Sequence, residues 1–169
     1  MATADEALQA VIEGDADALH AALTADPEAA DAIDAQGIPI LMQAIYKRRR
    51  DLVDILLAAE PTLDVFEAAA LGEQAWLEDL LDIDPGAAAA HAADGFTALH
   101  LAAVFGHESC MHVLLAHGAD VHAVARDGRD AVQLAEQAGH TQLAAQLLSA
   151  KNPPAAARAG AGFAPKRSA

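Results

Sequence analysis

Apolar positions recur with helical spacing between residues 97 and 117. The segment Ala98–Phe105 is apolar except for one histidine, and Thr97 before it is a residue type that favours helix N-termini. Gly106 follows at the place where a left-handed residue commonly ends a helix. The pattern therefore predicts one helix over 98–105 and, after a tight turn, a second over 108–116. The apolar positions of the second helix are Cys110, Met111, Val113, Leu114 and Leu115.

This pattern recurs along the chain. A shift of 33 residues brings Asp94-Gly95 onto Asp127-Gly128 and Gly106-His107 onto Gly139-His140. A second shift, of 58 residues, relates the first two units to the third and fourth. Units of this size cannot bury an apolar face alone, so they must stack on their neighbours. We expect an all-α solenoid of about five helix-turn-helix units, at residues 5–35, 36–62, 63–93, 94–126 and 127–150.

The fourth unit, "DGFTALHLAAVFGH…VLLAHGADVHA", closely resembles the ankyrin repeat. Residues 127–148 resemble it clearly, whereas 36–62 lacks the Thr, the His and the Gly. The resemblance implies short β-hairpin-like fingers between units. It also implies that Thr97 and His100 bond to each other and to neighbouring backbone, which is a structural rather than a catalytic role. We expect a structural role also for Gly106, His107, Gly139 and His140.

Charge and composition limit the partners. The chain of 169 residues has a net charge of −15, and all 25 acidic residues lie within residues 1–150 together with only six of the ten basic ones. An acidic body repels nucleic acid and anionic membranes and favours a basic partner surface. The N-terminus does not resemble a signal peptide and no apolar run is long enough to span a membrane. With one cysteine, no intramolecular disulfide is possible, which favours a reducing compartment, so we expect the protein in the cytoplasm. We also expect a monomer. The alanine-rich, lysine-poor composition resembles that of proteins from GC-rich bacteria.

Candidate chemical groups favour structural interpretations. His112, His117 and His122 are spaced by five residues, whereas a helical metal pair is spaced by four, so we expect no metal and no cofactor. No G-x-S-x-G motif is present, and nothing in the pattern implies a pocket that would perturb a carboxylate. Cys110 lies on an apolar helix face. Trp76 falls at the same position of the third unit, so we expect it to be the largest core side chain of that unit.

Two basic segments leave alternatives open. Lys47-Arg48-Arg49-Arg50 replaces the Gly-His turn of the fourth unit; it would either pair internally, for instance with Asp51 or Asp54, or dock an acidic segment of a partner. Residues 151–169 are rich in Pro, Gly and Ala without apolar periodicity, which predicts a disordered tail. That tail would be solvated, fold back on the acidic body, or bind a partner.

The resemblance implies that a partner binds on the concave surface, through finger tips and the ends of first helices. Our first hypothesis is a non-enzymatic protein-binding module, an adaptor or scaffold. The second is an acidic inhibitor or immunity-type protein that masks a basic enzyme surface, and an enzyme is the least favoured alternative. The candidate partner-binding residues are Ile38, Phe96 and Arg129 on the fingers and Tyr46, Lys47, Leu71, Val104, Phe105 and Gln137 at helix ends.

Overall fold

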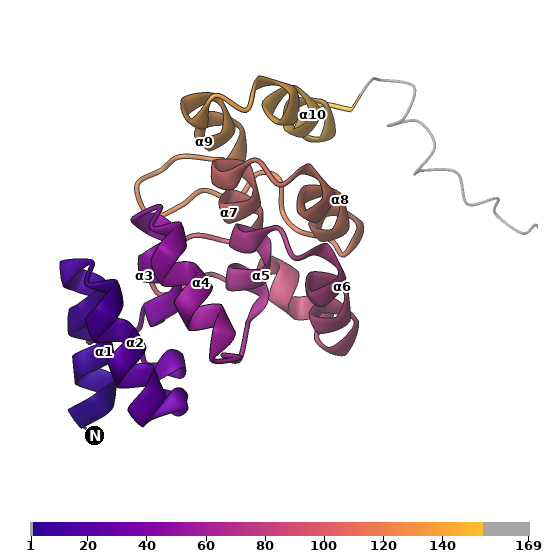
Figure 1. Ribbon diagram of the computed structural model, residues 1–169. Coiled ribbons are helices and arrows are strands. Elements are labelled where there is room, and N and C mark those ends of the chain that lie inside the picture. The colour runs from indigo at the N-terminus through magenta and orange to yellow at the C-terminus, as the bar shows by residue number, and fades with distance from the viewer. Residues whose placement is uncertain (1, 154–169) are drawn as a thin grey trace, which may run out of the picture.

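The structure, a computed structural model, describes residues 2–153, and in this range the α-helices form five consecutive pairs. The pairs stack from the indigo N-terminal helix to the yellow C-terminal one (Figure 1). The fold is the predicted all-α solenoid, and the pair in the fourth unit has the predicted bounds. The pairs are α1 Ala2–Glu13 with α2 Ala16–Ala25, α3 Ile40–Tyr46 with α4 Arg50–Ala58, α5 Val65–Leu71 with α6 Gln74–Ile83, α7 Ala98–Phe105 with α8 Glu108–Ala116, and α9 Ala131–Ala138 with α10 Thr141–Lys151; the 3-10 helices η1 Pro27–Asp31 and η2 Pro85–Ala89 follow α2 and α6.

A left-handed residue ends the first helix of each pair. At Gly106 φ is +79°, and a Cβ placed there would lie 2.5 Å from Cε1 of His140 in the next unit. Glycine is therefore required at this position both for its backbone conformation and for the close contact between units. In the second unit the corresponding residue is Arg48, with φ of +54°, a conformation that is uncommon for a side chain of this size.

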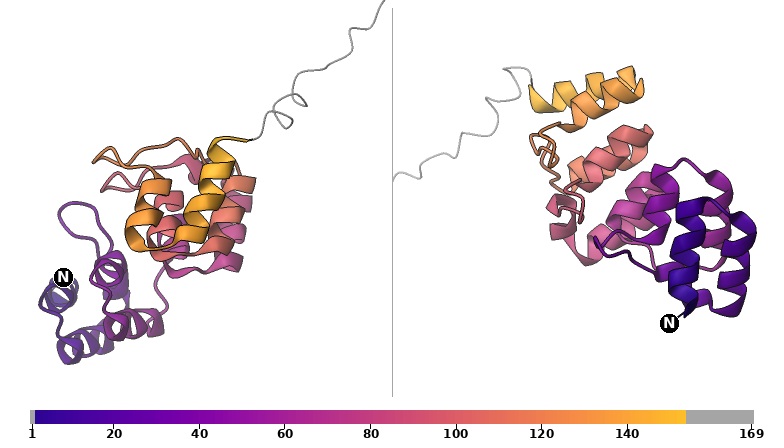
Figure 2. Two further views of the ribbon diagram at one scale, coloured as in Figure 1. Left: turned by 90° about the horizontal axis from the view of Figure 1, so that it is seen from above. Right: turned by 90° about the vertical axis from the view of Figure 1, so that its left-hand side faces the viewer.

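The fingers follow the second helices of three units. Isolated antiparallel bridges close them between Ile33 and Pro39, between His91 and Thr97, and between Val124 and Asp130. The left panel of Figure 2 shows these connections as loops that extend to one side of the helices. The connection between α4 and α5, residues 59–64, is described throughout and forms no such bridge. The row of fingers is therefore interrupted between the second and third units.

The buried side chains form two hydrophobic clusters. One contains side chains of α5 to α10, from Val65 to Leu147. The other contains side chains of α1 to α4, together with Ala70 of α5 and Leu101 of α7. Alanine and leucine make up most of both clusters, which lets the helices approach closely.

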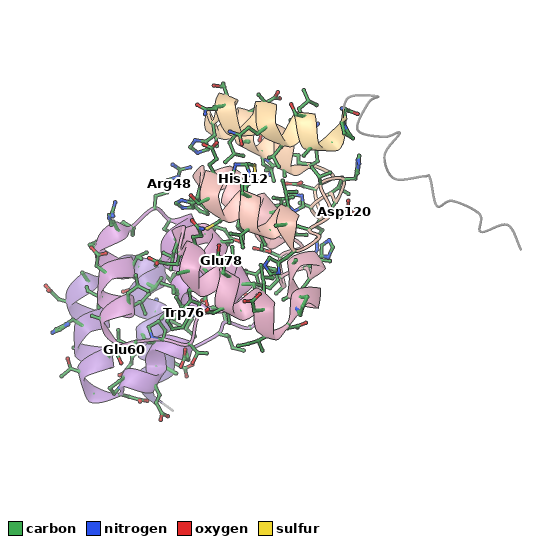
Figure 3. All side chains as sticks on the ribbon, turned by 90° about the vertical axis from the view of Figure 1, so that its right-hand side faces the viewer. Arg48, Glu60, Trp76, Glu78, His112 and Asp120 are labelled. Atoms are coloured by element: carbon green, nitrogen blue, oxygen red, sulfur yellow. The ribbon has the colours of Figure 1, made fainter. Side chains whose placement is uncertain are left out.

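The prediction that Trp76 is a core residue is wrong. Its side chain is 51% exposed, on the face of α6 seen in Figure 3. The third unit instead buries Leu77 and Leu81, one position later along the helix than Cys110 and Leu114 in the fourth. A displacement of one residue turns a helical side chain by about 100°, and this turn moves the tryptophan to the surface.

The prediction that Cys110 of α8 lies in the core is confirmed, because its side chain is fully buried. Burial, with Glu73 and Glu78 nearby, raises the pKa of its thiol to about 11, so the thiolate is disfavoured.

At the C-terminal end α10 extends to Lys151, whose Nζ lies 2.5 Å from Asp130 Oδ2. The rest of the predicted disordered tail, from residue 154 onward, lies outside the described residues.

Candidate functional site

A groove lies between two fingers, the first helices of the fourth and fifth pairs, and the end of α3. Its volume is about 370 Å³. We call it the finger–helix groove, and five of the nine candidate partner-binding residues line it: Tyr46, Phe96, Val104, Arg129 and Gln137. Its other lining residues are Asp94, Leu101, Leu134 and Ala138.

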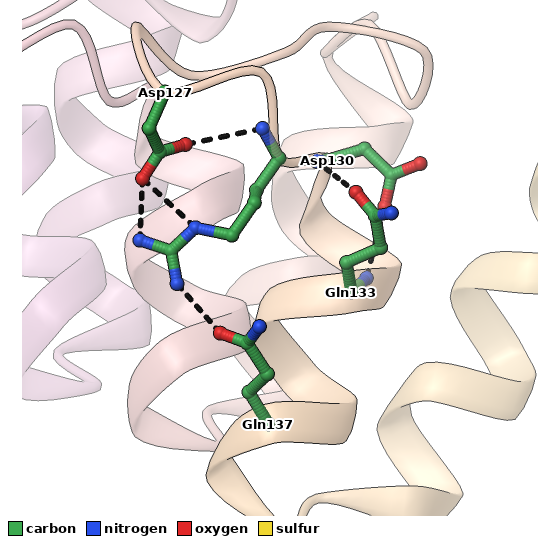
Figure 4. A network of polar contacts seen from close by, with 5 residues as sticks. Asp127, Asp130, Gln133 and Gln137 are labelled. Carbon is green, nitrogen blue, oxygen red and sulfur yellow. Dashed lines mark hydrogen bonds and ion pairs between the residues drawn. The ribbon is translucent and has the colours of Figure 1, made fainter.

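The groove is held at its C-terminal end by a polar network. Arg129 Nε donates to Asp127 Oδ2 at 2.8 Å and Arg129 Nη1 donates to Gln137 Oε1 at 2.6 Å (Figure 4). Asp127 Oδ1 also accepts the backbone N–H of Arg129 at 3.1 Å. The guanidinium is thereby fixed across the finger and the end of α9. Side by side in the same figure, Asp130 and Gln133 form the capping box that begins α9.

A second polar contact joins units that are not neighbours in the stack. The hydroxyl of Tyr46, at the end of α3, donates to Asp94 Oδ2 at 2.5 Å, on the finger between the third and fourth units. Burial raises the pKa of the Tyr46 phenol far above its ordinary value, and the hydrogen bond to Asp94 raises it further, so the phenol stays a donor. Asp94 Oδ1 accepts the N–H of Phe96 at 3.1 Å, which fixes the carboxylate from its other side.

The remaining candidate residues lie apart from the groove. Ile38 lines a smaller hollow on the other side of the Tyr46–Asp94 contact. Leu71 and Phe105 are half-buried against the N-terminal core cluster, and Arg48 stacks over the Phe105 ring with 6.0 Å from Cζ to the ring centroid. Lys47 donates to the backbone oxygen of Ile12 at 3.1 Å. The nine candidate residues therefore do not all line the finger–helix groove.

The basic run 47–50 pairs largely within the molecule. Arg49 binds Asp51, with Nη2 2.7 Å from Oδ2, and also donates to the carbonyl oxygen of Gly14 at 2.9 Å. The pairing with Asp51 was one of the two predicted alternatives. The contact with Gly14 resembles that of His107, whose Nε2 lies 2.9 Å from the carbonyl oxygen of Ala70 in the preceding unit. Arg49 thus joins its unit to the preceding one, as His107 does.

Thr97 and His100 form a closed set of bonds at the start of α7. The Thr97 N–H donates to His100 Nδ1 at 3.0 Å, and the two side chains lie 2.9 Å apart, Oγ1 to Nδ1. Because Nδ1 accepts, Nε2 has the proton and donates to the Ala123 carbonyl at 3.1 Å. Burial lowers the pKa of His100, so the neutral ring that this network needs is favoured. These contacts leave no free nucleophile or base in the pair.

A capping box at the start of α5 was not predicted from the sequence. At the start of α5 the Asp64 side chain accepts the N–H of Glu67, and Glu67 Oε2 accepts the N–H of Asp64 at 3.1 Å. Glu67 is only 4% exposed, and burial raises its pKa to about 7, with further contributions from Asp64 and Asp31. The D-x-x-E spacing before an apolar run was the signal that could have identified it.

Comparisons with known proteins agree with this architecture. A family model for ankyrin repeats (3 copies) matches residues 65–157. A probable E3 ubiquitin-protein ligase, XBOS31, from Oryza sativa subsp. japonica is 37% identical over 86 residues, which are 50% of this chain. The chain spans 19% of the length of that protein. Among residues 2–153, no helix is long and apolar enough to cross a membrane.

Proposed function

Because this chain belongs to the ankyrin repeat family, whose repeats are protein–protein interaction modules, we propose that it is a non-enzymatic adaptor or scaffold. The partner protein binds in the finger–helix groove. The observation that supports this site is the gathering of side chains from α3, α7, α9 and two fingers around one hollow. A site made from several units needs the assembled solenoid, as expected of a repeat protein.

The groove has the composition of a protein-binding surface. Phe96, Leu101, Val104 and Leu134 give it an apolar centre, and Asp94, Arg129 and Gln137 give it a polar edge. Interfaces commonly combine an apolar centre with a polar rim, and arginine and aromatic residues are frequent among their energetically dominant positions. Arg129 is already fixed by Asp127, so its guanidinium loses little freedom when a partner binds.

The arrangement of titratable groups supports the non-enzymatic part of the proposal. Cys110 and Glu67, whose pKa values are raised, are buried in the core and do not line the finger–helix groove. Tyr46 does line it, but its raised pKa keeps the phenol protonated as the donor to Asp94. A catalytic acid or base would have to reach a substrate within hydrogen-bond distance. The single, buried cysteine also suits a reducing compartment, and we propose the cytoplasm.

Affinity capture with two charge-matched variants tests the groove. One variant has Val104→Glu with Gln137→Glu in the groove, and the control has Trp76→Glu with His112→Glu on the exposed faces of α6 and α8. Each variant introduces two carboxylates, and circular dichroism first establishes that both fold. A protein from the lysate of the source organism that wild type and control retain, and the groove variant loses, supports the proposal. Equal retention by all three contradicts it.

Charge favours a second candidate, the acidic inhibitor that masks a basic enzyme surface. The net charge is −15, and several basic side chains are already paired within the molecule, including Arg49 with Asp51 and Lys151 with Asp130. The outward charge is therefore mainly negative. Salt separates the two candidates, because the association rate of an electrostatic mask falls steeply with ionic strength, whereas that of an apolar groove changes little.

A further inference from the structure

The interruption in the finger row leaves a second hollow. The connection from α4 to α5 has no finger, so the fingers at 33–39 and 91–97 face each other across the gap. They nearly meet at their tips, where a Cβ placed on Gly37 would lie 3.4 Å from Cβ of Ala93. Beneath this contact remains a hollow of about 190 Å³, which we call the inter-finger hollow. It is smaller than the roughly 300–1,000 Å³ of sites for drug-sized ligands, and it suits one long side chain.

The walls of the inter-finger hollow are apolar and its polar groups are mainly acceptors. Ile38, Pro39, Met42 and Phe66 form the apolar walls. The carboxylates of Asp64 and Asp94 also line it, together with Tyr46 and His91, and neither lysine nor arginine does. A cation with an apolar stem fits such a lining, because the stem contacts the walls while the head reaches the carboxylates.

Both carboxylates are fixed and keep capacity for another donor. Asp64 Oδ1 accepts the N–H groups of Phe66 and Glu67 at 2.8 and 3.0 Å, and its Oδ2 accepts no hydrogen bond within residues 2–153. Asp94 accepts one bond on each oxygen, from Tyr46 and from Phe96. An ionised carboxylate offers about four lone-pair sites, so two or more remain on each group.

From this geometry we propose that the inter-finger hollow binds an arginine side chain of the partner protein. This inference rests on the proposed function, because the arginine belongs to the partner bound in the adjoining groove. The Tyr46–Asp94 contact lies between the two hollows, since both residues line both of them. The guanidinium is preferred over an ammonium group because its planar fork matches a carboxylate and stacks on aromatic rings such as Phe66. The net charge of −15 favours the approach of such a cation.

The methyl group of Met42 gives a direct test that needs no partner. Nα-acetyl-arginine amide is added to the protein labelled with ¹³C at its methionine methyl groups, and the NMR signals of Met42 and Met111 are followed. Met42 lines the hollow, whereas Met111 is buried among α5–α10 side chains and serves as the internal control. We expect the Met42 signal to shift in a saturable way while Met111 does not move. The neutral citrulline analogue should bind at least about tenfold more weakly, because the charge-assisted bonds are lost.

Two variants locate the contact. Asp94→Asn removes the charge but keeps both neighbours, since the amide oxygen still accepts from Phe96 and the amide N–H can donate to the Tyr46 oxygen. Asp120→Asn is the matched control, because Asp120 makes the same kind of turn bond, to the N–H of His122 at 2.8 Å, away from the hollow. Weaker binding of about tenfold in the first variant alone supports the proposal. An unmoved Met42 signal, equal binding of citrulline, or equal binding by Asp94→Asn overturns it.

The outcome is independent of the partner-capture experiment. A Met42 response with no partner captured would mean that the hollow binds a guanidinium while the proposed adaptor function is wrong. A captured partner with no Met42 response would mean that the adaptor function holds while the hollow does not bind a guanidinium. Lysine amide serves as a third probe, and binding equal to that of arginine amide would overturn the preference for arginine.

Discussion

Replacing Glu67 with glutamine should stabilise the protein at neutral and alkaline pH. The carboxyl group is 4% exposed, and its pKa is raised to about 7, first by burial and then by the charges of Asp64 and Asp31. In the unfolded chain its pKa is about 4.3. Glutamine has nearly the same shape and keeps the capping bond, as Gln133 does at the corresponding position of α9, where its Oε1 accepts the N–H of Asp130 at 3.1 Å.

The size and sign follow from proton linkage. Between about pH 4.3 and 7 the folded state holds a proton that the unfolded state has released, so the Glu67 contribution to stability falls as pH rises through this window. This contribution is fully present below the pKa of Glu67 in the unfolded chain and is lost above its pKa in the folded protein. The difference of about 2.7 pKa units corresponds to about 4 kcal/mol, at about 1.4 kcal/mol per unit. Glu67→Gln should therefore gain about 1 kcal/mol at pH 5 and up to about 4 kcal/mol at pH 8.

Urea unfolding at pH 5, 6, 7 and 8 measures this gain as the difference in free energy of unfolding between variant and wild type. Glu136→Gln, at an exposed position of α9, is the control and should give a small difference that does not change over this range. Parallel pH profiles for wild type and Glu67→Gln would refute the reasoning, because they would mean that the carboxyl group gains no proton on folding.

Three further predictions concern the turns and the core. Gly106→Ala should destabilise the protein by about 2 kcal/mol or more, because the added methyl group meets the His140 ring and the backbone conformation is unfavourable. Gly139→Ala, with φ of +85° and no atom within 4 Å of the added Cβ, should cost only about 1 kcal/mol. Equal costs of the two substitutions in urea unfolding would disprove the contact with His140. Arg48→Gly should raise stability by roughly 0.5–1 kcal/mol by relieving its positive φ, and a lower Tm would show that its stacking contact matters more. Leu114→Ala should cost about 2–5 kcal/mol, since the side chain is fully buried; a cost under about 1 kcal/mol would contradict its place in the core.

The sequence predicts best what depends on neighbouring residues. Thr97 and Gly106 specify the start and end of α7 through local bonds and backbone preference, so its bounds follow from the pattern. Trp76 shows where this reasoning fails. Aligning the units by their turn glycines places it with Cys110, but α6 buries the next position along the helix, which only the packing of neighbouring units decides.

In the candidate site, too, some features follow from the sequence and others depend on packing between units. Ankyrin resemblance indicates the residues of the finger–helix groove, since the position within the unit determines which side chains face it. The Tyr46–Asp94 contact could not be found this way. It joins residues 48 positions apart, and it exists because the finger that would separate them is absent. Phe105 and Lys47 also make contacts within the molecule, with the Arg48 side chain and with the backbone oxygen of Ile12, which the position in the unit does not predict.

The division of the core into two clusters has a consequence for how the protein loses its structure. Side chains of α1–α4 pack mainly with one another, and those of α5–α10 do the same, so the boundary between them is a place where cooperativity is weak. Amide protons in α1–α4 should then exchange through openings that leave α5–α10 folded. Ala70 and Leu101 reach into the N-terminal cluster from the other side. We therefore expect the C-terminal three pairs to stay folded while the first two pairs unfold and refold against them.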